Sequence, residues 1–98
     1  MKPLHVDAIL QVIGDAMSPE IHDTDFVFIR FNPRPDDGKI AAVALNGEAT
    51  LKRIHYLPDG IILSSNNNFY PPMKFTGDEV KYVRIIGEMV GLLGLIHT

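Results

Sequence analysis

The sequence predicts a mainly β domain, compact and built from short, highly bent antiparallel strands and hairpins. Apolar runs typical of strands recur at short intervals, dense turn chemistry separates them, and no long window shows the 3.6-residue period of a helix. The clearest hairpin joins residues 39–45 to residues 48–57 through Asn46-Gly47, a pair that tolerates positive φ and favours a type I′ turn. These observations favour an all-β fold over a helical one.

The first third of the chain reads as two strands joined by a corner. Residues 8–14 form the first predicted strand, after which Pro19 opens one short helical turn with Ser18 as its cap. The next strand covers residues 26–31. It is apolar on both faces apart from Arg30, which predicts burial on two sides.

The remaining segments alternate turns with strands. Residues 32–38 form a loop because they contain two prolines and a terminal Asp-Gly, and residues 58–60 turn the chain into a strand over 61–64. Residues 65–79 are expected to be a surface loop, since they hold three consecutive asparagines and a Pro-Pro pair. A further strand is predicted over residues 80–86.

The last apolar run, residues 85–96, is too short to span a bilayer as a helix and contains Glu88. We interpret it as buried strand or interface. Its apolar side chains have little chain left to cover them, so they are candidates for core or for a dimer interface. These candidate interface residues are Leu92, Leu93, Leu95 and Ile96.

Length and composition restrict the function. The 98 residues fit a single domain, and 46% hydrophobic residues can build a core. The formal charge of −3 argues against a dedicated nucleic-acid surface, which would cluster Lys and Arg, so any DNA contact needs another domain. Without cysteine there is no disulfide, thiolate metal site or cysteine nucleophile, which fits a cytoplasmic protein.

Metal, cofactor and membrane roles have no sequence support. The four histidines lack ligand spacing, so we expect no metal and no cofactor. The N-terminal segment does not read as a signal peptide, and no membrane association is expected. The histidines are His5, His22, His55 and His97.

Two ordered motifs carry a resemblance to a known family. The run Gly14-Asp15-Ala16-Met17-Ser18-Pro19-Glu20-Ile21 resembles the nucleophile corner of LexA-like and phage-repressor self-cleaving serine peptidases, with alanine where the family has serine. The run Thr50-Leu51-Lys52-Arg53-Ile54 resembles the strand that holds that family's catalytic lysine, and Lys52 follows Ala16 by 36 positions. Further similarity lies in Asp37-Gly38, Leu63-Ser64-Ser65-Asn66, Tyr70-Pro71 and Ile86-Gly87-Glu88-Met89-Val90-Gly91, so that it covers nearly the whole chain.

The resemblance implies a Ser/Lys dyad on a LexA-like β domain. Lys52 would be the general base, its pKa lowered by apolar surroundings, and the Met17 N–H and Asp15 would belong to the oxyanion corner. Ala16 occupies the nucleophile position but has no hydroxyl, so the family is a peptidase while this chain is predicted to be inactive. Asp15 and Asp25 are expected to bond local backbone N–H groups and to take no part in acid–base chemistry.

Family members cut an Ala-Gly or Cys-Gly bond upstream of the nucleophile, and no such pair precedes Ala16. We therefore expect residues 1–98 to be one self-cleavage and dimerisation domain, with the DNA-binding domain and the cleavage-site linker left out. Ala16 is either an engineered replacement, which the otherwise intact motifs favour, or a natural change; the sequence does not separate the two.

The leading hypothesis is the dimerisation and latent autoproteolysis domain of a LexA-like or prophage transcriptional repressor. By family analogy it forms a homodimer, responds to a RecA filament in an SOS response, and reaches DNA only through the N-terminal domain. The alternatives are a polymerase-accessory member of the same fold, a signal-peptidase relative, and a natural non-cleaving pseudo-peptidase acting as a dimerisation module.

Overall fold

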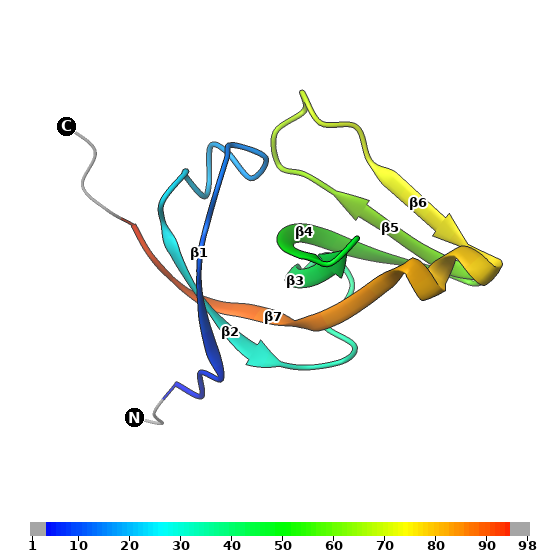
Figure 1. Ribbon diagram of the computed structural model, residues 1–98, viewed down its shortest axis with the longest axis horizontal. Helices are drawn as coiled ribbons and strands as arrows, with labels where there is room; N and C mark the ends of the chain where they lie inside the picture. The colour runs from blue at the N-terminus through cyan, green and yellow to red at the C-terminus, as the bar shows by residue number, and fades with distance from the viewer. Residues whose placement is uncertain (1–3, 95–98) are drawn as a thin grey trace.

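The chain forms one curved antiparallel sheet of seven strands (Figure 1). A computed structural model describes residues 4–94. The elements are β1 (Ala8–Gln11), β2 (Phe26–Phe31), β3 (Ile40–Leu45), β4 (Glu48–Leu57), β5 (Gly60–Ser64), β6 (Met73–Thr76), the 3₁₀ helix η1 (Gly77–Tyr82) and β7 (Val83–Leu93). The predicted mainly β fold is confirmed.

The strand order β1-β2-β7-β3-β4-β5-β6 places β7 inside the sheet, between β2 and β3, two strands from earlier in the chain. Register shifts where β7 meets β2 and β3 mark irregularities that bend the sheet, as β-bulges do. At Gly87 an added Cβ would lie 2.3 Å from the Arg30 carbonyl oxygen, so this central position of β7 has no room for a side chain.

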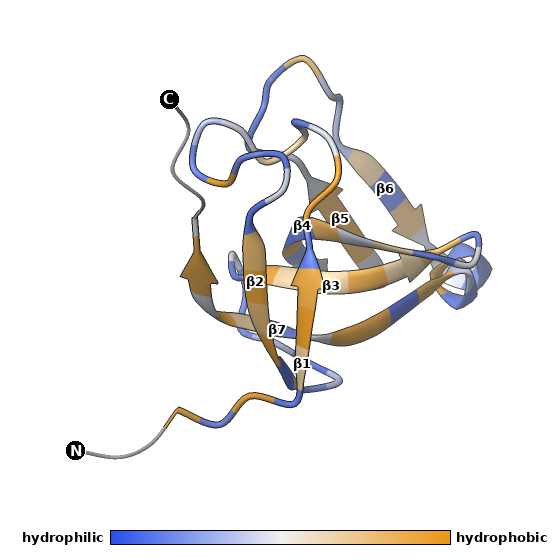
Figure 2. Cartoon of the chain, turned by 60° about the vertical axis from the view of Figure 1, so that its left-hand side comes forward, coloured by the Kyte–Doolittle hydropathy of each residue, from blue (hydrophilic) through white to orange (hydrophobic). Residues whose placement is uncertain are grey.

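The bent sheet encloses two apolar clusters. The first contains Met17, Ile21, Val27 and Ile29, and the second contains Ile54 and Leu63 among its members. Figure 2 shows hydrophobic residues concentrated in the strands and most hydrophilic ones in the connections. The described residues include no helix that is long and apolar enough to cross a membrane.

The hairpin between β3 and β4 forms as predicted. Leu45 faces Glu48, and the two residues between them have φ values of 50° at Asn46 and 81° at Gly47. Positive φ at both central positions is the requirement of a type I′ turn. This hairpin positions Lys52, because β4 extends from it.

Several segment boundaries differ from the sequence prediction. The first strand stops at Gln11 instead of residue 14, because the chain turns away where Gly14 has a φ of 92°. The predicted helical turn begins earlier than Pro19: the Ile21 amide donates to the Met17 carbonyl oxygen, so Ser18 lies inside a single turn instead of capping it, and no longer helix follows. Burial of β2 on two faces is also wrong: Val27 and Ile29 are buried on one face, whereas Phe26 and Phe28 on the opposite face are only half-buried.

The predicted loop over residues 65–79 contains structure. Residues 73–76 are the edge strand β6, and η1 covers residues 77–82, so the strand that was predicted to start at residue 80 starts at Val83 instead. Glu79 Oε1 accepts from the Thr76 amide at 3.3 Å, as in a capping box, and the spacing Thr76-x-x-Glu79 is the signal that predicts this helix start.

Candidate active site

The corner after β1 is held by its own backbone and by two buried anchors. The Gly14 amide donates to Asp23 Oδ1 at 2.7 Å, and the Ser18 amide donates to the Asp15 carbonyl oxygen at 3.1 Å. Met17 and Ile21 insert into the core with exposures of 2% and 1%. The corner therefore has a fixed backbone, with Ala16 half-buried at its turn.

Met17 contributes a buried side chain and a backbone amide to the corner. Its side chain fills the first apolar cluster. Within residues 4–94, its amide N–H donates no hydrogen bond, whereas the next amide, that of Ser18, bonds to Asp15. The corner thus offers one backbone donor beside the Ala16 side chain.

Lys52 is buried, contrary to the usual location of a strand lysine. It pairs with Ala41 across the β3–β4 hairpin, is 8% exposed, and lies between Leu51 and Ile54 in the apolar part of β4. Burial lowers the pKa of the Lys52 amine below its ordinary value of 10.5, because the charged form loses hydration. Lys52 Nζ donates to Ser65 Oγ at 2.7 Å.

The loop after β5 connects this lysine to the corner. The Asn67 amide donates to the Ala16 carbonyl oxygen at 2.9 Å, and Asn67 Nδ2 donates to the Asp15 carbonyl oxygen at 3.1 Å. Tyr70 reaches the same corner through its hydroxyl, while its ring centroid lies 5.9 Å from Lys52 Nζ. Figure 1 shows the loop that follows β5 at the same edge of the sheet as the corner that follows β1.

A groove runs past the nucleophile position. It has a volume of about 160 Å³ and is lined by residues 10–13 on one side, residues 49–51 on the other, and Ala16, Met17 and Val27. Its lining is mostly apolar, which suits small apolar side chains of an extended peptide. The groove therefore joins the corner to the strand that carries Lys52.

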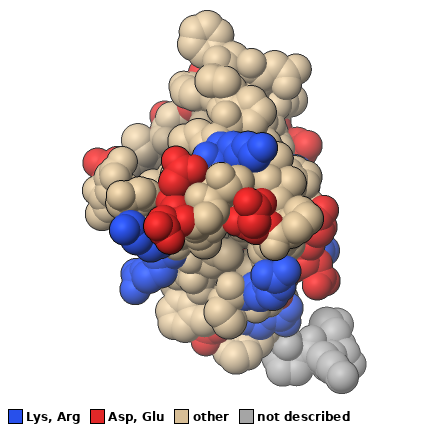
Figure 3. All heavy atoms as spheres, turned by 90° about the vertical axis from the view of Figure 1, so that its right-hand side faces the viewer, with Lys and Arg blue, Asp and Glu red and all other residues tan. Residues whose placement is uncertain are grey.

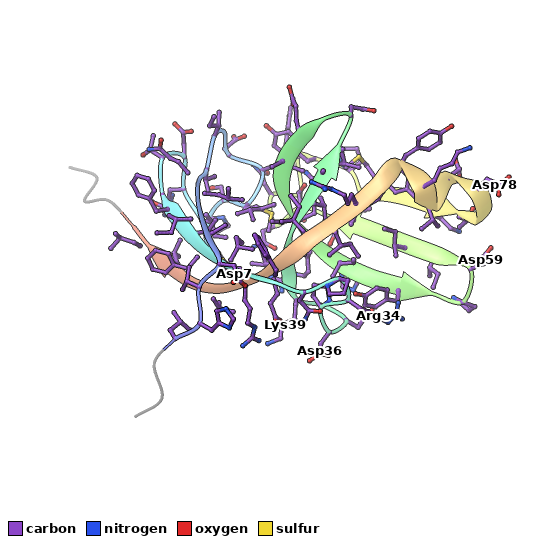
Figure 4. All side chains as sticks on the ribbon, turned by 60° about the horizontal axis from the view of Figure 1, so that its bottom comes forward. Asp7, Arg34, Asp36, Lys39, Asp59 and Asp78 are labelled. Carbon is purple, nitrogen blue, oxygen red and sulfur yellow. The ribbon has the colours of Figure 1, made fainter. Side chains whose placement is uncertain are left out.

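The other charged side chains of residues 4–94 are dispersed over the molecule (Figure 3, Figure 4). Figure 4 shows Asp7 and Asp36 along one edge of the molecule and Asp59 and Asp78 at its far end. Residues 4–94 contain no group of three or more His, Asp or Glu side chains that could hold a metal ion. On the face shown in Figure 3, acidic and basic side chains are interspersed, without the clustered positive charge that binds nucleic acid.

The structure brings some predicted residues together and leaves others apart. Asp15, Ala16 and Met17 share the corner, and the β5 loop links them to Lys52. Leu92 and Leu93 lie at the end of β7 with exposures of 43% and 54%, where they pair with Val27 and Phe26 of β2. The other two predicted interface residues, Leu95 and Ile96, lie outside the described residues.

The prediction for the two aspartates is half correct. Asp25 Oδ2 accepts from the His22 amide at 2.8 Å, which is the expected local backbone contact. Asp15 differs, because its carboxylate accepts from the Tyr70 hydroxyl at 2.6 Å, across 55 positions of sequence. A turn preference could not predict a contact that depends on where the β5 loop folds.

Sequence reasoning assigned no role to Ser65, Asn67 or Tyr70. The segments that contain Ser65 and Tyr70 carried part of the family resemblance, and that was the available signal. The Ser65 contact follows from the β4–β5 register, and the contacts of Asn67 and Tyr70 follow from the path of the loop after β5; neither is encoded by a local motif.

The curved antiparallel sheet, with a buried lysine joined to a tight corner, defines a small β domain of the peptidase type. The family described as Peptidase S24-like matches residues 2–90, and the chain belongs to this family.

Curated relatives agree with this assignment. The LexA repressor of Deinococcus radiodurans is 35% identical over 92 residues, covering 91% of this chain and 42% of the relative. The LexA repressor of Pseudothermotoga lettingae is 40% identical over 87 residues, covering 87% of this chain and 42% of the relative. LexA repressor 2 of Pseudomonas syringae pv. tomato is 38% identical over 74 residues, which is 74% of this chain and 37% of the relative. The chain is a LexA-like peptidase domain and spans about two fifths of the length of these relatives.

Proposed function

We propose that this domain is the dimerisation and latent self-cleavage module of a cytoplasmic LexA-like transcriptional repressor, and that its cleavage step is silent. The observation that carries the proposal is a buried lysine joined to a corner whose nucleophile position holds a methyl group. Lys52 has the burial that a neutral amine base needs, and Ala16 has no oxygen for that base to activate.

The chemistry assigned to the site follows from the contacts around it. With serine at position 16, a neutral Lys52 amine would take the hydroxyl proton while the oxygen attacked a peptide carbonyl lying in the groove. The Met17 amide N–H would donate to the developing oxyanion, since it is not engaged elsewhere within residues 4–94. Asp15 would keep the corner in place through Tyr70 without reacting.

With alanine at position 16, the first of these steps cannot occur. Removal of the nucleophile from a serine peptidase costs about six orders of magnitude in kcat. The fold does not depend on the missing hydroxyl, because Met17 and Ile21 anchor the corner from within the core. The domain can therefore hold two repressor subunits together without being cleaved.

Without cleavage, the remaining function is the association of this domain with a second copy of itself. Large apolar side chains stay exposed on β2 and β7, which pair through most of their length. We propose that this region, with Leu92 and Leu93, forms a symmetric homodimer interface. DNA would be contacted only through a separate domain, and a RecA filament would be the trigger in cleavable members of the family.

Restoring the hydroxyl tests the proposal. A chain extended upstream through its native linker and carrying Ala16→Ser is incubated at increasing alkaline pH, and fragments are followed by mass spectrometry. Alkali deprotonates Lys52 without a partner protein, so we expect cleavage at one upstream bond. The parent chain with Ala16 and the double variant with Lys52→Ala should both stay whole.

A folded Ala16→Ser chain that remains intact at every pH would contradict latent peptidase function. It would favour the second candidate, a natural pseudo-peptidase that serves only as a permanent dimerisation module. Ala16 itself is the observation that supports this candidate, because a permanently paired repressor has no need of a nucleophile.

A further inference from the structure

The Lys52 amine has a hydroxyl partner although residue 16 supplies none. Lys52 Nζ lies 2.7 Å from Ser65 Oγ, within the range in which an activating base contacts its nucleophile. We propose that Ser65 is the hydroxyl that Lys52 activates in this chain, and that the pair accepts the acyl group of small activated esters. This role of Ser65 depends on the proposed role of Lys52 as a base, but not on cleavage of a linker.

Strand pairing places these two side chains together. Arg53 faces Ser64 in the antiparallel register of β4 and β5. The next positions outward are Lys52 of β4 and Ser65, the residue that directly follows β5. Directly opposed residues in such a pair project to the same face, with Cβ atoms roughly 4.5–5.5 Å apart. The contact is therefore set by the backbone of two strands.

The surroundings of Lys52 favour a neutral amine. Burial lowers the pKa of Lys52, and no ion pair among the described residues joins a carboxylate to it. The Tyr70 ring lies 5.9 Å from the amine and contributes an aromatic face without a formal charge. Ser65 is only half-buried, so a small ester can approach the pair from its side.

The residue after Ser65 carries a buried donor with no acceptor. Arg53 Nε and Nη2 lie 3.3 and 3.2 Å from Asn66 Oδ1, which fixes the orientation of the Asn66 amide. Asn66 Nδ2 is then buried without a hydrogen-bond partner among the described residues. The Arg53 contacts therefore hold Asn66 in one orientation directly after Ser65.

The proposed acyl transfer balances without another reactant. Neutral Lys52 takes the Ser65 hydroxyl proton as Oγ bonds to the acyl carbon, and the carbonyl electron pair moves onto oxygen. When the carbonyl re-forms, the bond to the leaving alkoxide or phenoxide breaks and the Lys52 ammonium returns the proton to it. Water then attacks the Ser65 ester while Lys52 accepts one of its protons; the bond from the acyl carbon to Oγ breaks, the Lys52 ammonium returns the proton to Oγ, and the carboxylic acid is released.

A simpler explanation of the contact is that Ser65 only satisfies the hydrogen-bonding capacity of a buried amine. The two explanations differ in reactivity. A hydroxyl that merely accepts from Lys52 reacts like any exposed serine, whereas a hydroxyl deprotonated by Lys52 reacts faster than its neighbours and loses this advantage when Lys52 is replaced.

The experiment uses the 98-residue chain itself. The protein is treated with an alkyl fluorophosphonate and, separately, with p-nitrophenyl acetate, and modified peptides are mapped by mass spectrometry. Ser65→Ala removes the proposed nucleophile, and Lys52→Met removes the base. Ser64→Ala is the matched control, because Ser64 is the adjacent half-buried serine and its side chain makes none of these contacts. Circular dichroism verifies that every variant is folded.

We expect one adduct, on Ser65, with the acetyl form labile to hydroxylamine as an ester is. Lys52→Met should slow labelling by roughly a hundredfold or more, the usual contribution of a general base, and Ser64→Ala should match the parent. A folded parent that is unlabelled, that is acetylated on Lys52 instead, or that labels equally fast without Lys52 would overturn the proposal. None of these outcomes depends on Ala16→Ser, so failure of self-cleavage and failure of the Ser65–Lys52 pair are distinguishable.

Discussion

The Tyr70 hydroxyl lies 2.6 Å from Asp15 Oδ1, and this bond joins the loop after β5 to the corner that holds Ala16. Asn67 adds two further contacts between the same segments. The corner is therefore held from outside by the loop and from inside by its core anchors.

The phenol of Tyr70 should report this contact. The hydrogen bond to the Asp15 carboxylate raises the pKa of Tyr70 above its ordinary value of 10.0, because the neutral phenol is the donor and a nearby negative charge opposes ionisation. The stabilisation is complete below the unfolded-state pKa and is lost as pH rises through the raised folded-state pKa. Asp15→Asn should return the titration of Tyr70 to the ordinary range.

Phenolate absorbance measured against pH tests this expectation. Tyr70→Phe identifies the contribution of Tyr70 among the three tyrosines, which is necessary because burial also raises the pKa of Tyr56. A Tyr70 titration that is the same in the parent and in Asp15→Asn would show that the contact does not persist in solution.

Lys52 should give the stability of the fold a pH dependence of the opposite sign to that of Tyr70. Its pKa is lowered in the folded state, so the unfolded chain binds more protons between that lowered value and 10.5. Stability should therefore rise with pH across this window and fall as pH decreases through it. Lys52→Met keeps the apolar stem and removes the titration.

Urea unfolding of the parent and of Lys52→Met, measured from pH 7 to pH 10, gives the comparison. We expect Lys52→Met to be the more stable at pH 7, with the difference shrinking as the parent amine loses its proton. A constant difference across the range would mean that the Lys52 amine is well hydrated in the folded protein.

Much of the fold follows from local sequence chemistry. The strands Phe26–Phe31 and Glu48–Leu57 have their predicted bounds because dense turn signals flank them, and Asn46-Gly47 adopts the backbone that its residue types favour. The strand β6 could not be predicted in this way. It is four residues long and follows two prolines, and it is a strand because the edge of β5 offers it hydrogen-bond partners.

The candidate site also contains some residues that local sequence motifs predict and others that depend on tertiary structure. Ala16 and Lys52 can be found from motifs, since each lies in a local run with a recognisable pattern. Ser65 cannot, because its contact with Lys52 exists only once β4 and β5 are in register. Burial of Lys52 is likewise a tertiary effect, since strand lysines are usually exposed.

The lowered pKa of Glu88 on β7 should contribute to the loss of stability at acid pH. The hydrogen bond from Arg30 lowers the pKa of Glu88 below its ordinary value of 4.5, with further contributions from Asn32 and Lys39 against an opposing effect of burial. A lowered carboxyl pKa stabilises the fold above the unfolded-state value, and this stabilisation is lost as pH falls through the folded-state value.

Glu88→Gln should therefore be less stable than the parent at pH 7, and the difference should shrink as pH falls from the ordinary value of 4.5 through the lowered folded-state pKa. Denaturant unfolding from pH 7 to pH 3 measures it. Glu48→Gln is the matched control, because Glu48 is exposed at a hairpin end and makes no ion pair among the described residues. Equal acid profiles for the two variants would show that the Arg30 contact contributes nothing to stability.

The end of β7 provides the test of association. Leu93 is 54% exposed and pairs with Phe26 of β2, so its side chain extends the apolar surface at one end of the sheet. A charge buried in an apolar interface is strongly unfavourable, so Leu93→Glu should convert a homodimer to a monomer. Tyr82→Glu is the control, because Tyr82 is 60% exposed on η1 at the other end of β7. Sedimentation velocity over a range of protein concentrations distinguishes the two masses. A dimer that survives Leu93→Glu but dissociates with Tyr82→Glu would move the interface to the η1 end of the sheet, and a parent that is monomeric at every concentration would remove the dimerisation function from this domain.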